Sequence, residues 1–373
     1  MRAIIAGGGS GGHLFPGLAL ARELAEKDGA QVLFVGAEKG IESRIVPKSG
    51  FPIKFLPVEG VMGRTAPAKV RAAYKMAVSF FKARRLMESF RPDVVIGTGG
   101  YASFSPVMAA WSCSIPSLIM EQNVAPGAAN KLLARVAGAV AVTYQESMPC
   151  FPRAKSFLTG NPIREEILEA RRADSSFETF GLEPGIFTVF VFGGSSGARA
   201  INSALAGALE HLLDLKQDIQ FLHQCGETDY QGVREAYRRT GFRAMVAPFV
   251  FQMPEAYAVS DLIISRAGAT TLAEITALGK AAVLIPYPYA GGHQELNAIK
   301  LEGLGAAILI RERELTAESL AAKIRMLKED ETARNEMSSR SRVVGKPEAA
   351  RNVADIALSL VRIKNSSRKA RNV

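Results

Sequence analysis

Three stretches of this sequence place a glycine-containing turn between an apolar segment and a segment with helical spacing. They lie at residues 4–12, 191–197 and 265–271. In such a turn, backbone N–H groups approach a ligand at the positive end of a helix dipole, so phosphate is the natural ligand. The first turn also satisfies the dinucleotide spacing G-x-G-x-x-G, a weak signal alone, and Glu38 is the nearest acid that could bind a ribose. The turns therefore predict a phosphate-containing ligand and leave a nicotinamide enzyme as one alternative.

His13 follows the first turn directly and is the side chain best suited to acid–base chemistry. An imidazole at this position could act as a general base. A histidine that caps its own helix or binds a backbone carbonyl fits the sequence equally well. Both interpretations remain open at this point.

The third turn predicts contacts to a nucleotide. Backbone N–H groups near Ala269, Thr270 and Thr271 could hold a diphosphate, and Glu274, about one helical turn further, could accept two ribose hydroxyls. A solvated glutamate on an ordinary helix is the alternative. Gln294 lies with His293 at a later loop-to-helix junction, at the sheet edge where open α/β sheets bind ligands.

The elements that must position these residues follow from the alternation of short apolar segments with amphipathic ones, which is typical of βαβ units. One series of strands is expected at 3–6, 32–35, 94–96, 117–119 and 139–142, and a second at 188–192, 220–223, 244–247, 262–264 and 282–285. Helical segments such as 200–215 and 272–278 separate them. We expect two Rossmann-like, doubly wound parallel-sheet domains, joined near residues 161–164. A last helix at about 348–363 is expected to pack back across the first domain.

The composition describes a packed protein with a negatively charged partner. The chain has 373 residues, of which 48% are hydrophobic, and a formal net charge of +10. Nucleic acid, anionic lipid and phosphorylated substrates fit this charge, but no nucleic-acid recognition motif is present, so we predict no nucleic-acid partner. Three widely spaced cysteines suit a reducing cytoplasm, and residues 1–6 leave no room for a signal peptide. The uncharged stretch 97–120 is interrupted by Pro106 and Pro116 and is not expected to span a membrane.

Taken together, these strings resemble the MurG family of bacterial UDP-N-acetylglucosamine transferases, over nearly the whole chain. The motifs that carry the resemblance are Gly8-Gly9-Ser10-Gly11-Gly12-His13, Gly97-Thr98-Gly99-Gly100-Tyr101, Glu121-Gln122-Asn123, Thr159-Gly160-Asn161-Pro162-Ile163-Arg164, Phe192-Gly193-Gly194-Ser195-Ser196-Gly197, and the segments 265–274 and 293–298. Their order and joint presence are highly specific.

The resemblance implies the GT-B fold, in which two Rossmann-like domains face a cleft. By analogy, residues 1–162 form an acceptor-binding and membrane-associating domain, residues 163–345 form the UDP-sugar-binding domain, and residues 346–373 form the returning helix and a basic tail. The implied reaction is inverting transfer of N-acetylglucosamine from UDP-N-acetylglucosamine to the 4-hydroxyl of lipid-linked muramoyl pentapeptide, a step of peptidoglycan synthesis. No metal or other cofactor is implied.

The resemblance also assigns site residues. His13 is the candidate base and Glu121 the alternative, while Tyr101 lies on the acceptor side. The implied donor contacts are Ser10, Gly11, Gly12, Asn123, Arg164, Ser195, Val250, Ala269, Thr270, Thr271, Leu272, Ala273, Glu274 and Gln294.

A lipid-linked acceptor requires an adhesive surface, and the segment 68–90 offers one. Apolar residues fall at helical spacing and cations flank them; the membrane-contact candidates are Lys69, Val70, Tyr74, Lys75, Val78, Phe81, Lys82 and Arg85. A core helix with a solvated basic side is the alternative. The expected location is peripheral, on the cytoplasmic face of the bacterial plasma (inner) membrane, against anionic lipid.

Rival functions share parts of this pattern. Another GT-B enzyme, such as a diacylglycerol glycosyltransferase or a UDP-N-acetylglucosamine 2-epimerase, would keep the nucleotide-binding half. A nucleotide-binding module or an NAD-dependent dehydrogenase would use the first glycine turn, but the paired second domain argues against both.

Overall fold

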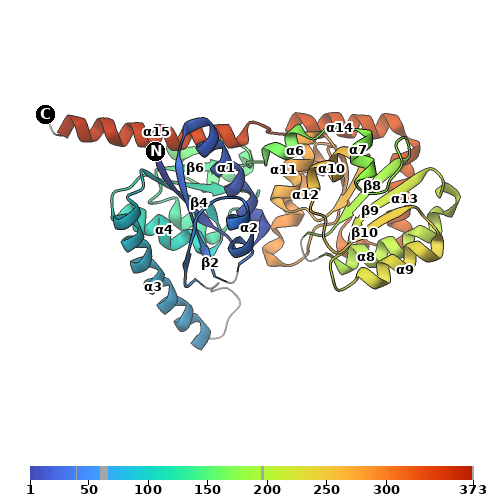
Figure 1. Ribbon diagram of the computed structural model, residues 1–373, viewed down its shortest axis with the longest axis horizontal. Helices are drawn as coiled ribbons and strands as arrows, with labels where there is room; N and C mark the ends of the chain where they lie inside the picture. The colour runs from blue at the N-terminus through green and yellow to red at the C-terminus, as the bar shows by residue number, and fades with distance from the viewer. Residues whose placement is uncertain (39, 59–65, 195–196, 372–373) are drawn as a thin grey trace. The chain divides into compact units, whose positions relative to one another are not determined.

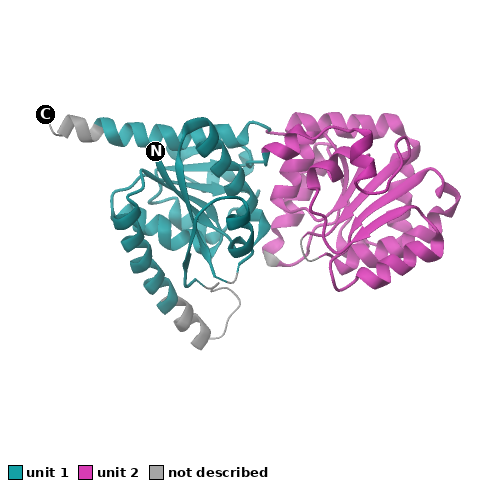
Figure 2. Cartoon of the chain, in the orientation of Figure 1, with its two compact units in different colours: residues 1–164, 347–373 teal, residues 165–346 magenta. Residues whose placement is uncertain are grey.

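The structure is a computed structural model that describes residues 1–38, 40–58, 66–194 and 197–371; the side chains of residues 66–73, 290 and 367–371 are outside this description. The chain forms two compact units (Figure 2). Unit 1 comprises Met1–Arg164 and Pro347–Val373, and unit 2 comprises Glu165–Lys346.

Unit 1 is built on a parallel sheet with the strand order β3-β2-β1-β4-β5-β6-β7. Its strands are β1 (Arg2–Gly7), β2 (Gln31–Ala37), β3 (Ile53–Leu56), β4 (Val94–Gly99), β5 (Ser117–Glu121), β6 (Ala139–Val142) and β7 (Ser156–Leu158). Its helices are α1 (Gly11–Asp28), α2 (Glu42–Lys48), α3 (Ala66–Phe90), α4 (Tyr101–Ser112), α5 (Ala128–Leu133) and α15 (Ala349–Arg371), with short 3-10 turns at Gln145–Cys150 and Arg153–Lys155.

Unit 2 repeats the architecture with the order β10-β9-β8-β11-β12-β13, again parallel. Its strands are β8 (Phe187–Phe192), β9 (Ile219–Gln224), β10 (Ala244–Ala247), β11 (Leu262–Ser265), β12 (Ala281–Leu284) and β13 (Ile308–Leu309). Its α-helices are α6 (Glu165–Glu169), α7 (Asp174–Glu178), α8 (Arg199–Ala208), α9 (Tyr230–Thr240), α10 (Met253–Val259), α11 (Ala269–Leu278), α12 (His293–Gly303), α13 (Ala317–Glu329) and α14 (Glu331–Val344). The 3-10 turns are Leu209–Leu215, Ala290–Gly292 and Glu312–Glu314.

The central strands are apolar at successive positions because helices cover both faces of each sheet. In β1, Ile4 and Ile5 point to opposite faces and belong to two different core clusters, yet both are fully buried. The predicted fold class, two Rossmann-like parallel-sheet domains, is confirmed.

The structure adds to the sequence expectations at several points. Strands β3, β7 and β13 were not expected, and the helix expected over residues 200–215 changes to a 3-10 turn at Leu209. The uncharged stretch 97–120 forms the end of β4, all of α4 and most of β5. Among the described residues, no helix is long and apolar enough to span a membrane.

The last helix, α15, runs beside α1 within unit 1 (Figure 1). Its Arg351 binds Glu23 at 3.2 Å and Asp28 at 3.0 Å on α1. Val353, Ala354 and other apolar residues of α15 enter the core of unit 1. The end of the chain thus completes the domain that the beginning of the chain starts.

Candidate functional site

His13 lies half-buried in the first turn of α1, at the carboxyl edge of the unit 1 sheet. Its Nδ1 is 3.1 Å from the carbonyl oxygen of Thr98, which also accepts a hydrogen bond of 2.7 Å from the Gln122 amide. A carbonyl only accepts, so Nδ1 carries the proton and Nε2 carries the lone pair. Burial lowers the pKa of His13 below 6.5, although the Glu121 charge and the bond to Thr98 act in the opposite direction. The imidazole is therefore held neutral, with Nε2 as its basic atom.

Two glycines leave room for this imidazole. A Cβ on Gly99 would lie 2.6 Å from His13 Nδ1, and a Cβ on Gly100 would lie 3.2 Å from His13 Cδ2. Both glycines also have positive φ, +107° and +72°, which other residues rarely adopt. Tyr101 begins α4 directly after them and is exposed. The second motif of unit 1 therefore packs against the histidine of the first.

Glu121, the alternative base, is almost completely buried and uses both carboxylate oxygens. Oε1 accepts from the backbone N–H and side-chain amide of Asn123 at 3.0 and 3.3 Å. Oε2 accepts from the Gly127 N–H at 3.0 Å and the Asn130 amide at 2.8 Å. This arrangement fixes the loop after β5, and with it the donor candidate Asn123, and leaves Glu121 less suited than His13 to take a proton.

The remaining candidates of unit 1 lie around the first glycine turn. Ser10 is the exposed N-cap residue of α1 and precedes Gly11 and Gly12, the first two residues of the helix. The guanidinium of Arg164 lies 4.7 Å from the centre of the Phe15 ring, also on α1. The second domain was predicted to begin at residue 163, whereas the first segment of unit 1 ends at Arg164.

Glu42 is a residue that the sequence reasoning missed. Its carboxylate is fully buried beneath the first glycine turn and accepts a hydrogen bond of 2.9 Å from the Gly9 N–H. Glu38, the acid expected to serve a ribose, is exposed instead. A carboxylate on an N–H of this turn disfavours a second anion there, which argues against a dinucleotide. The sequence signal that could have pointed to Glu42 is its position shortly after two glycines, Gly36 and Gly40, which leave room for its side chain.

In unit 2, the start of α11 has the features of an anion site. Gly268 is its N-cap, no side chain caps it, and its first turn contains no acidic residue. Glu274, one turn further, is buried and accepts a hydrogen bond of 2.7 Å from the Tyr257 hydroxyl. The alternative of a solvated glutamate is therefore wrong, since Tyr257 holds the carboxylate in one orientation. Leu272 and Ala273 lie in the same helix, between Thr271 and Glu274.

Gln224 is a second residue that the sequence reasoning missed, and it ties two parts of this edge together. Its amide donates to the carbonyl of Gly194, in the second glycine turn, at 2.9 Å, and its Oε1 accepts from the Val250 N–H at 2.8 Å. Val250 is buried, whereas its two neighbours in sequence, Phe249 and Phe251, are exposed. Ser195 lies outside the described residues.

Gln294 lies in the first turn of α12 and accepts a hydrogen bond of 3.0 Å from the Tyr287 N–H. Tyr287 in turn packs edge-on against Tyr289, and Arg266 lies 5.4 Å over the Tyr287 ring. The loop after β12 therefore places two exposed aromatic rings near the starts of α11 and α12.

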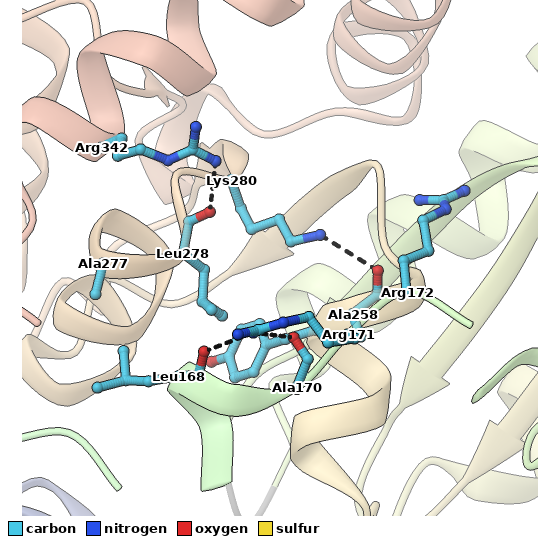
Figure 3. A pocket seen from close by; sticks show the side chains of 10 residues that line it. Leu168, Ala170, Arg171, Arg172, Ala258, Ala277, Leu278, Lys280 and Arg342 are labelled. Carbon is cyan, nitrogen blue, oxygen red and sulfur yellow. Dashed lines mark hydrogen bonds between the residues drawn. The ribbon is translucent and has the colours of Figure 1, made fainter. Parts of the chain in front are cut away.

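A cavity of about 320 Å³ lies elsewhere in unit 2 (Figure 3), lined by Leu168, Ala170, Arg171, Arg172, Tyr257, Ala258, Ala277, Leu278, Lys280 and Arg342. Lys280 Nζ donates to the carbonyl of Ser260, just after α10, at 2.8 Å, and Arg342 donates to the Leu278 carbonyl at the end of α11 at 3.4 Å. Burial lowers the pKa of Lys280 to about 8. Cations at helix C-termini donate hydrogen bonds to the last carbonyls and interact favourably with the helix dipole. This structural role accounts for the positive charge of the cavity.

The membrane-contact candidates lie on α3 of unit 1, which packs on α4. Tyr74 and Phe81 are 71% and 63% exposed. Lys82 and Arg85 are exposed as well, while Lys75 and Val78 are half-buried. Lys69 and Val70 lie where the side chains are outside the described residues. Large aromatic side chains exposed beside cations are unusual on a helix that only covers a core.

Within the described part of the chain, no group of three or more His, Cys, Asp or Glu side chains is arranged to hold a metal ion. The polar groups described at these two sheet edges include backbone amides, the imidazole of His13, carboxylates and amide side chains. These groups suit the binding of phosphates and hydroxyls and the transfer of a proton.

Comparison with known proteins assigns the chain to a family. Residues 3–142 match the glycosyltransferase family 28 N-terminal domain, and residues 188–354 match the C-terminal domain of the same family. The UDP-N-acetylglucosamine--N-acetylmuramyl-(pentapeptide) pyrophosphoryl-undecaprenol N-acetylglucosamine transferase of Thermodesulfovibrio yellowstonii is 49% identical, over 98% of this chain and 100% of that protein. The transferase of the same name from Myxococcus xanthus is 44% identical, over 97% and 93%. The crystal structure of Acinetobacter baumannii MurG is 31% identical, with a TM-score of 0.75 over 96% of this chain and 99% of that chain.

The chain belongs to the MurG family. It is thus a glycosyltransferase with the GT-B fold, as its resemblance implied. A UDP-N-acetylglucosamine 2-epimerase from Neisseria meningitidis has a TM-score of 0.71 but only 14% identity, which shows a shared fold alone. Membership of the MurG family, rather than of the epimerases, is what the sequence similarity supports.

Proposed function

We propose that this protein transfers N-acetylglucosamine from UDP-N-acetylglucosamine to the 4-hydroxyl of the muramoyl sugar in undecaprenyl-pyrophosphoryl-MurNAc-pentapeptide. The observation that carries the proposal is the 49% identity, over essentially the full length of both proteins, to a transferase named for these substrates. The product would be the disaccharide-linked lipid from which peptidoglycan is made.

Unit 2 is proposed to bind the donor. The uncapped start of α11 suits the diphosphate, because N–H groups and the helix dipole favour negative charge there. Glu274, oriented by Tyr257, suits the ribose hydroxyls, and Val250 with the rings beside it suits the uracil. Gln294 and Ser195 complete the proposed contacts. The same N–H groups would stabilise the charge that develops on the departing UDP.

Unit 1 is proposed to supply the base and the acceptor side. The acceptor's 4-hydroxyl oxygen forms a bond to the anomeric carbon of the donor while the bond from that carbon to the UDP oxygen breaks, and the hydroxyl proton moves to His13 Nε2. Thr98 supports this step because its carbonyl fixes the tautomer that leaves Nε2 basic. The lowered pKa of His13 supports it as well, since the imidazole is neutral before the reaction. Ser10, Gly11, Gly12 and Asn123 would contact the donor sugar, and Tyr101 would lie on the acceptor side. Arg164 would meet the charge that develops on the departing UDP.

We further propose that α3 holds the protein at the cytoplasmic face of the plasma membrane. The acceptor carries a lipid, so its polar end is presented at a bilayer surface. The exposed Tyr74 and Phe81 could enter the headgroup region while Lys82 and Arg85 meet anionic lipid. Trp111 at the end of α4, 56% exposed, could join this surface.

The acceptor assignment is tested by offering the purified protein radiolabelled UDP-N-acetylglucosamine with one of three additions. These are a short-chain analogue of the lipid-linked muramoyl pentapeptide, diacylglycerol, or no acceptor. We expect labelled product with the first alone. Label on diacylglycerol would move the assignment to a glycolipid transferase, and conversion of the labelled sugar to its manno epimer without acceptor would identify an epimerase.

A further inference from the structure

Glu42 is the best-buried acidic side chain near the proposed reaction centre, and the proposed mechanism does not use it. Its exposed fraction is 0%, and each carboxylate oxygen accepts one backbone N–H. Oε2 accepts from Gly9, in the first glycine turn, and Oε1 accepts from Ala37, at the end of β2, both at 2.9 Å. Both oxygens therefore act as hydrogen-bond acceptors. The carboxylate therefore bridges the glycine turn and the neighbouring strand.

Three glycines surround this carboxylate, and a side chain on any of them would displace it. A Cβ on Gly8, Gly36 or Gly40 would lie 2.2, 2.6 or 2.0 Å from an atom of Glu42. These distances are far below van der Waals contact, so no residue but glycine fits without moving Glu42. The sequence thus provides a pocket built around one carboxylate.

The bridge continues to His13. A Cβ on Gly100 would lie 2.9 Å from the carbonyl oxygen of Gly8 and 3.2 Å from His13 Cδ2. The glycine turn, Gly100 and the imidazole are therefore packed without spare room. We expect a shift of the turn to move Gly100 and the imidazole beside it, and small displacements of a catalytic group are costly to rate.

We propose that Glu42 is a positioning residue of the proposed transfer reaction, whose carboxylate serves as the built-in anion of the first glycine turn and so sets the position of His13. This inference rests on the proposed function for its catalytic consequence, but the hydrogen bond from Gly9 is independent of that function. A phosphate would otherwise be the natural anion for such a turn. Glu42 fills this role from within the chain and leaves the turn to face an uncharged part of the substrate.

The test uses the full-length protein with Glu42→Gln, Glu42→Ala and, as matched control, Glu38→Gln, which alters an exposed acid four residues away. In Glu42→Gln one oxygen becomes an NH2 group and confronts an N–H, so we expect kcat to fall about 10- to 100-fold. The KM for UDP-N-acetylglucosamine should change less than about twofold, because unit 2 is proposed to bind the donor. Glu38→Gln should match the wild type.

Chemical rescue separates positioning from mere loss of stability. In Glu42→Ala, formate should enter the vacated space and raise kcat at least about fivefold above the value without formate. Nitrate at equal ionic strength should not raise kcat. If Glu42→Ala does not fold, Glu42→Gln with an unchanged melting temperature carries the test. A wild-type kcat in Glu42→Gln, or a loss of kcat that only parallels a loss of stability, would overturn the proposal.

The Gly9 amide gives a readout that needs no substrate. In the ¹H–¹⁵N spectrum of the wild type, its proton should be shifted downfield and exchange slowly, and Glu42→Gln or Glu42→Ala should move it upfield. If the wild type shows no transfer but this signal behaves as expected, the proposed function fails and the bridge stands. If transfer occurs and the Gly9 signal is the same in all variants, the bridge fails and the function stands.

Discussion

The Nδ1 of His13 is hydrogen-bonded to the Thr98 carbonyl, and this bond determines that Nε2 is the nitrogen that can act as a base. The chain uses a backbone acceptor for a purpose that a carboxylate serves in many other sites, so no second acid is needed to hold the tautomer. At the scale of single residues, function here depends on backbone carbonyls and N–H groups as much as on side chains. The sequence singled out His13 from its place after the first turn, but Thr98 and Glu42 act through contacts that only the folded chain brings together.

The pH dependence of transfer should reflect the lowered pKa of His13. The base must be neutral, and burial moves its protonation to lower pH, so the acid limb of kcat/KM should fall below pH 6.5. The measurement is kcat/KM for the short-chain acceptor between pH 5 and pH 9. An acid limb centred above pH 6.5 would contradict this account. Replacement of the exposed His211 by glutamine should leave the profile unchanged.

The stability of unit 2 should decrease in mild acid because of His223. This histidine is fully buried between Asn202 and Tyr237, and burial lowers its pKa to about 3. Between pH 6.5 and pH 3 the unfolded chain binds a proton that the folded chain does not, so the contribution of His223 to the free energy of unfolding is lost as the pH falls. From pH 7 to pH 5 this loss should be about 2 kcal/mol. Denaturant unfolding of His223→Gln at both pH values should show a smaller decrease, and an equal decrease would contradict the prediction.

Among the elements, α11 and α3 carry most of the proposed function, and they do so in different ways. Helix α11 offers its first turn, where backbone N–H groups and the dipole act together on an anion. Helix α3 offers one face, where exposed aromatic rings lie beside cations. Spacing in the sequence indicated both helices, because a helix start and an amphipathic face are local properties. Which face of α3 is exposed depends on α4, against which it packs.

An acid in the first turn of α11 should separate binding from stability. Thr271→Asp places a negative charge where the diphosphate is proposed to bind, so UDP should bind at least about tenfold more weakly. The same charge favours the helix dipole, so the melting temperature should not fall. Thr271→Asn is the size-matched neutral control. Calorimetric titration with UDP measures the effect, and unchanged affinity in Thr271→Asp would place the diphosphate elsewhere.

Removal of three cations from α3 should weaken membrane binding. Each cation near an anionic surface contributes about 1 kcal/mol, so changing Lys75, Lys82 and Arg85 to serine should lower partitioning about 100-fold. The measurement is co-sedimentation with vesicles containing phosphatidylglycerol. Serine at three exposed cations of unit 1 outside α3, Arg44, Lys48 and Arg153, is the control. If both triple variants lost partitioning equally, membrane binding would depend on the net charge of the protein and not on α3.

In the whole molecule, two units of similar architecture differ at the glycine turn that follows their first strand. Both begin with a strand, a glycine turn and a helix, but in unit 1 the Glu42 carboxylate occupies an N–H of that turn. The alternative of a dehydrogenase required a dinucleotide phosphate at this turn and a ribose contact from Glu38. The structure instead has the Glu42 carboxylate at the turn, and Glu38 is exposed. Similarity of fold therefore does not make the two glycine turns equivalent in chemistry.

One nucleotide should bind per chain. UDP is expected to titrate with a stoichiometry of one, because the diphosphate is proposed to bind at the start of α11 in unit 2, whereas the first glycine turn of unit 1 already binds the Glu42 carboxylate. NAD should give no heat of binding, because unit 1 would have to accept a pyrophosphate beside Glu42. A second UDP site, or NAD binding at micromolar concentration, would contradict the division of roles between the units.

The fold class could be predicted because buried parallel strands leave continuous apolar segments in the sequence, as residues 3–6 do. The strands that were missed lie at sheet edges. Phe55 in β3 and Phe157 and Leu158 in β7 are exposed, and β13 has only two residues, so none of them shows the buried pattern. Gln224 could not be predicted as a link because its two partners come from distant segments. Local signals identify the turns, whereas the contacts that hold them in place are long-range.

The most direct test of the central claim is transfer of labelled N-acetylglucosamine to the short-chain muramoyl-pentapeptide lipid by the wild type and by His13→Ala, with the linkage of the product determined by NMR. We expect a β-1,4 product from the wild type and a rate about 10²- to 10⁴-fold lower in the variant, with UDP affinity retained. A folded, UDP-binding wild type that forms no such product would contradict the proposed acceptor, and a variant as fast as the wild type would contradict His13 as the base.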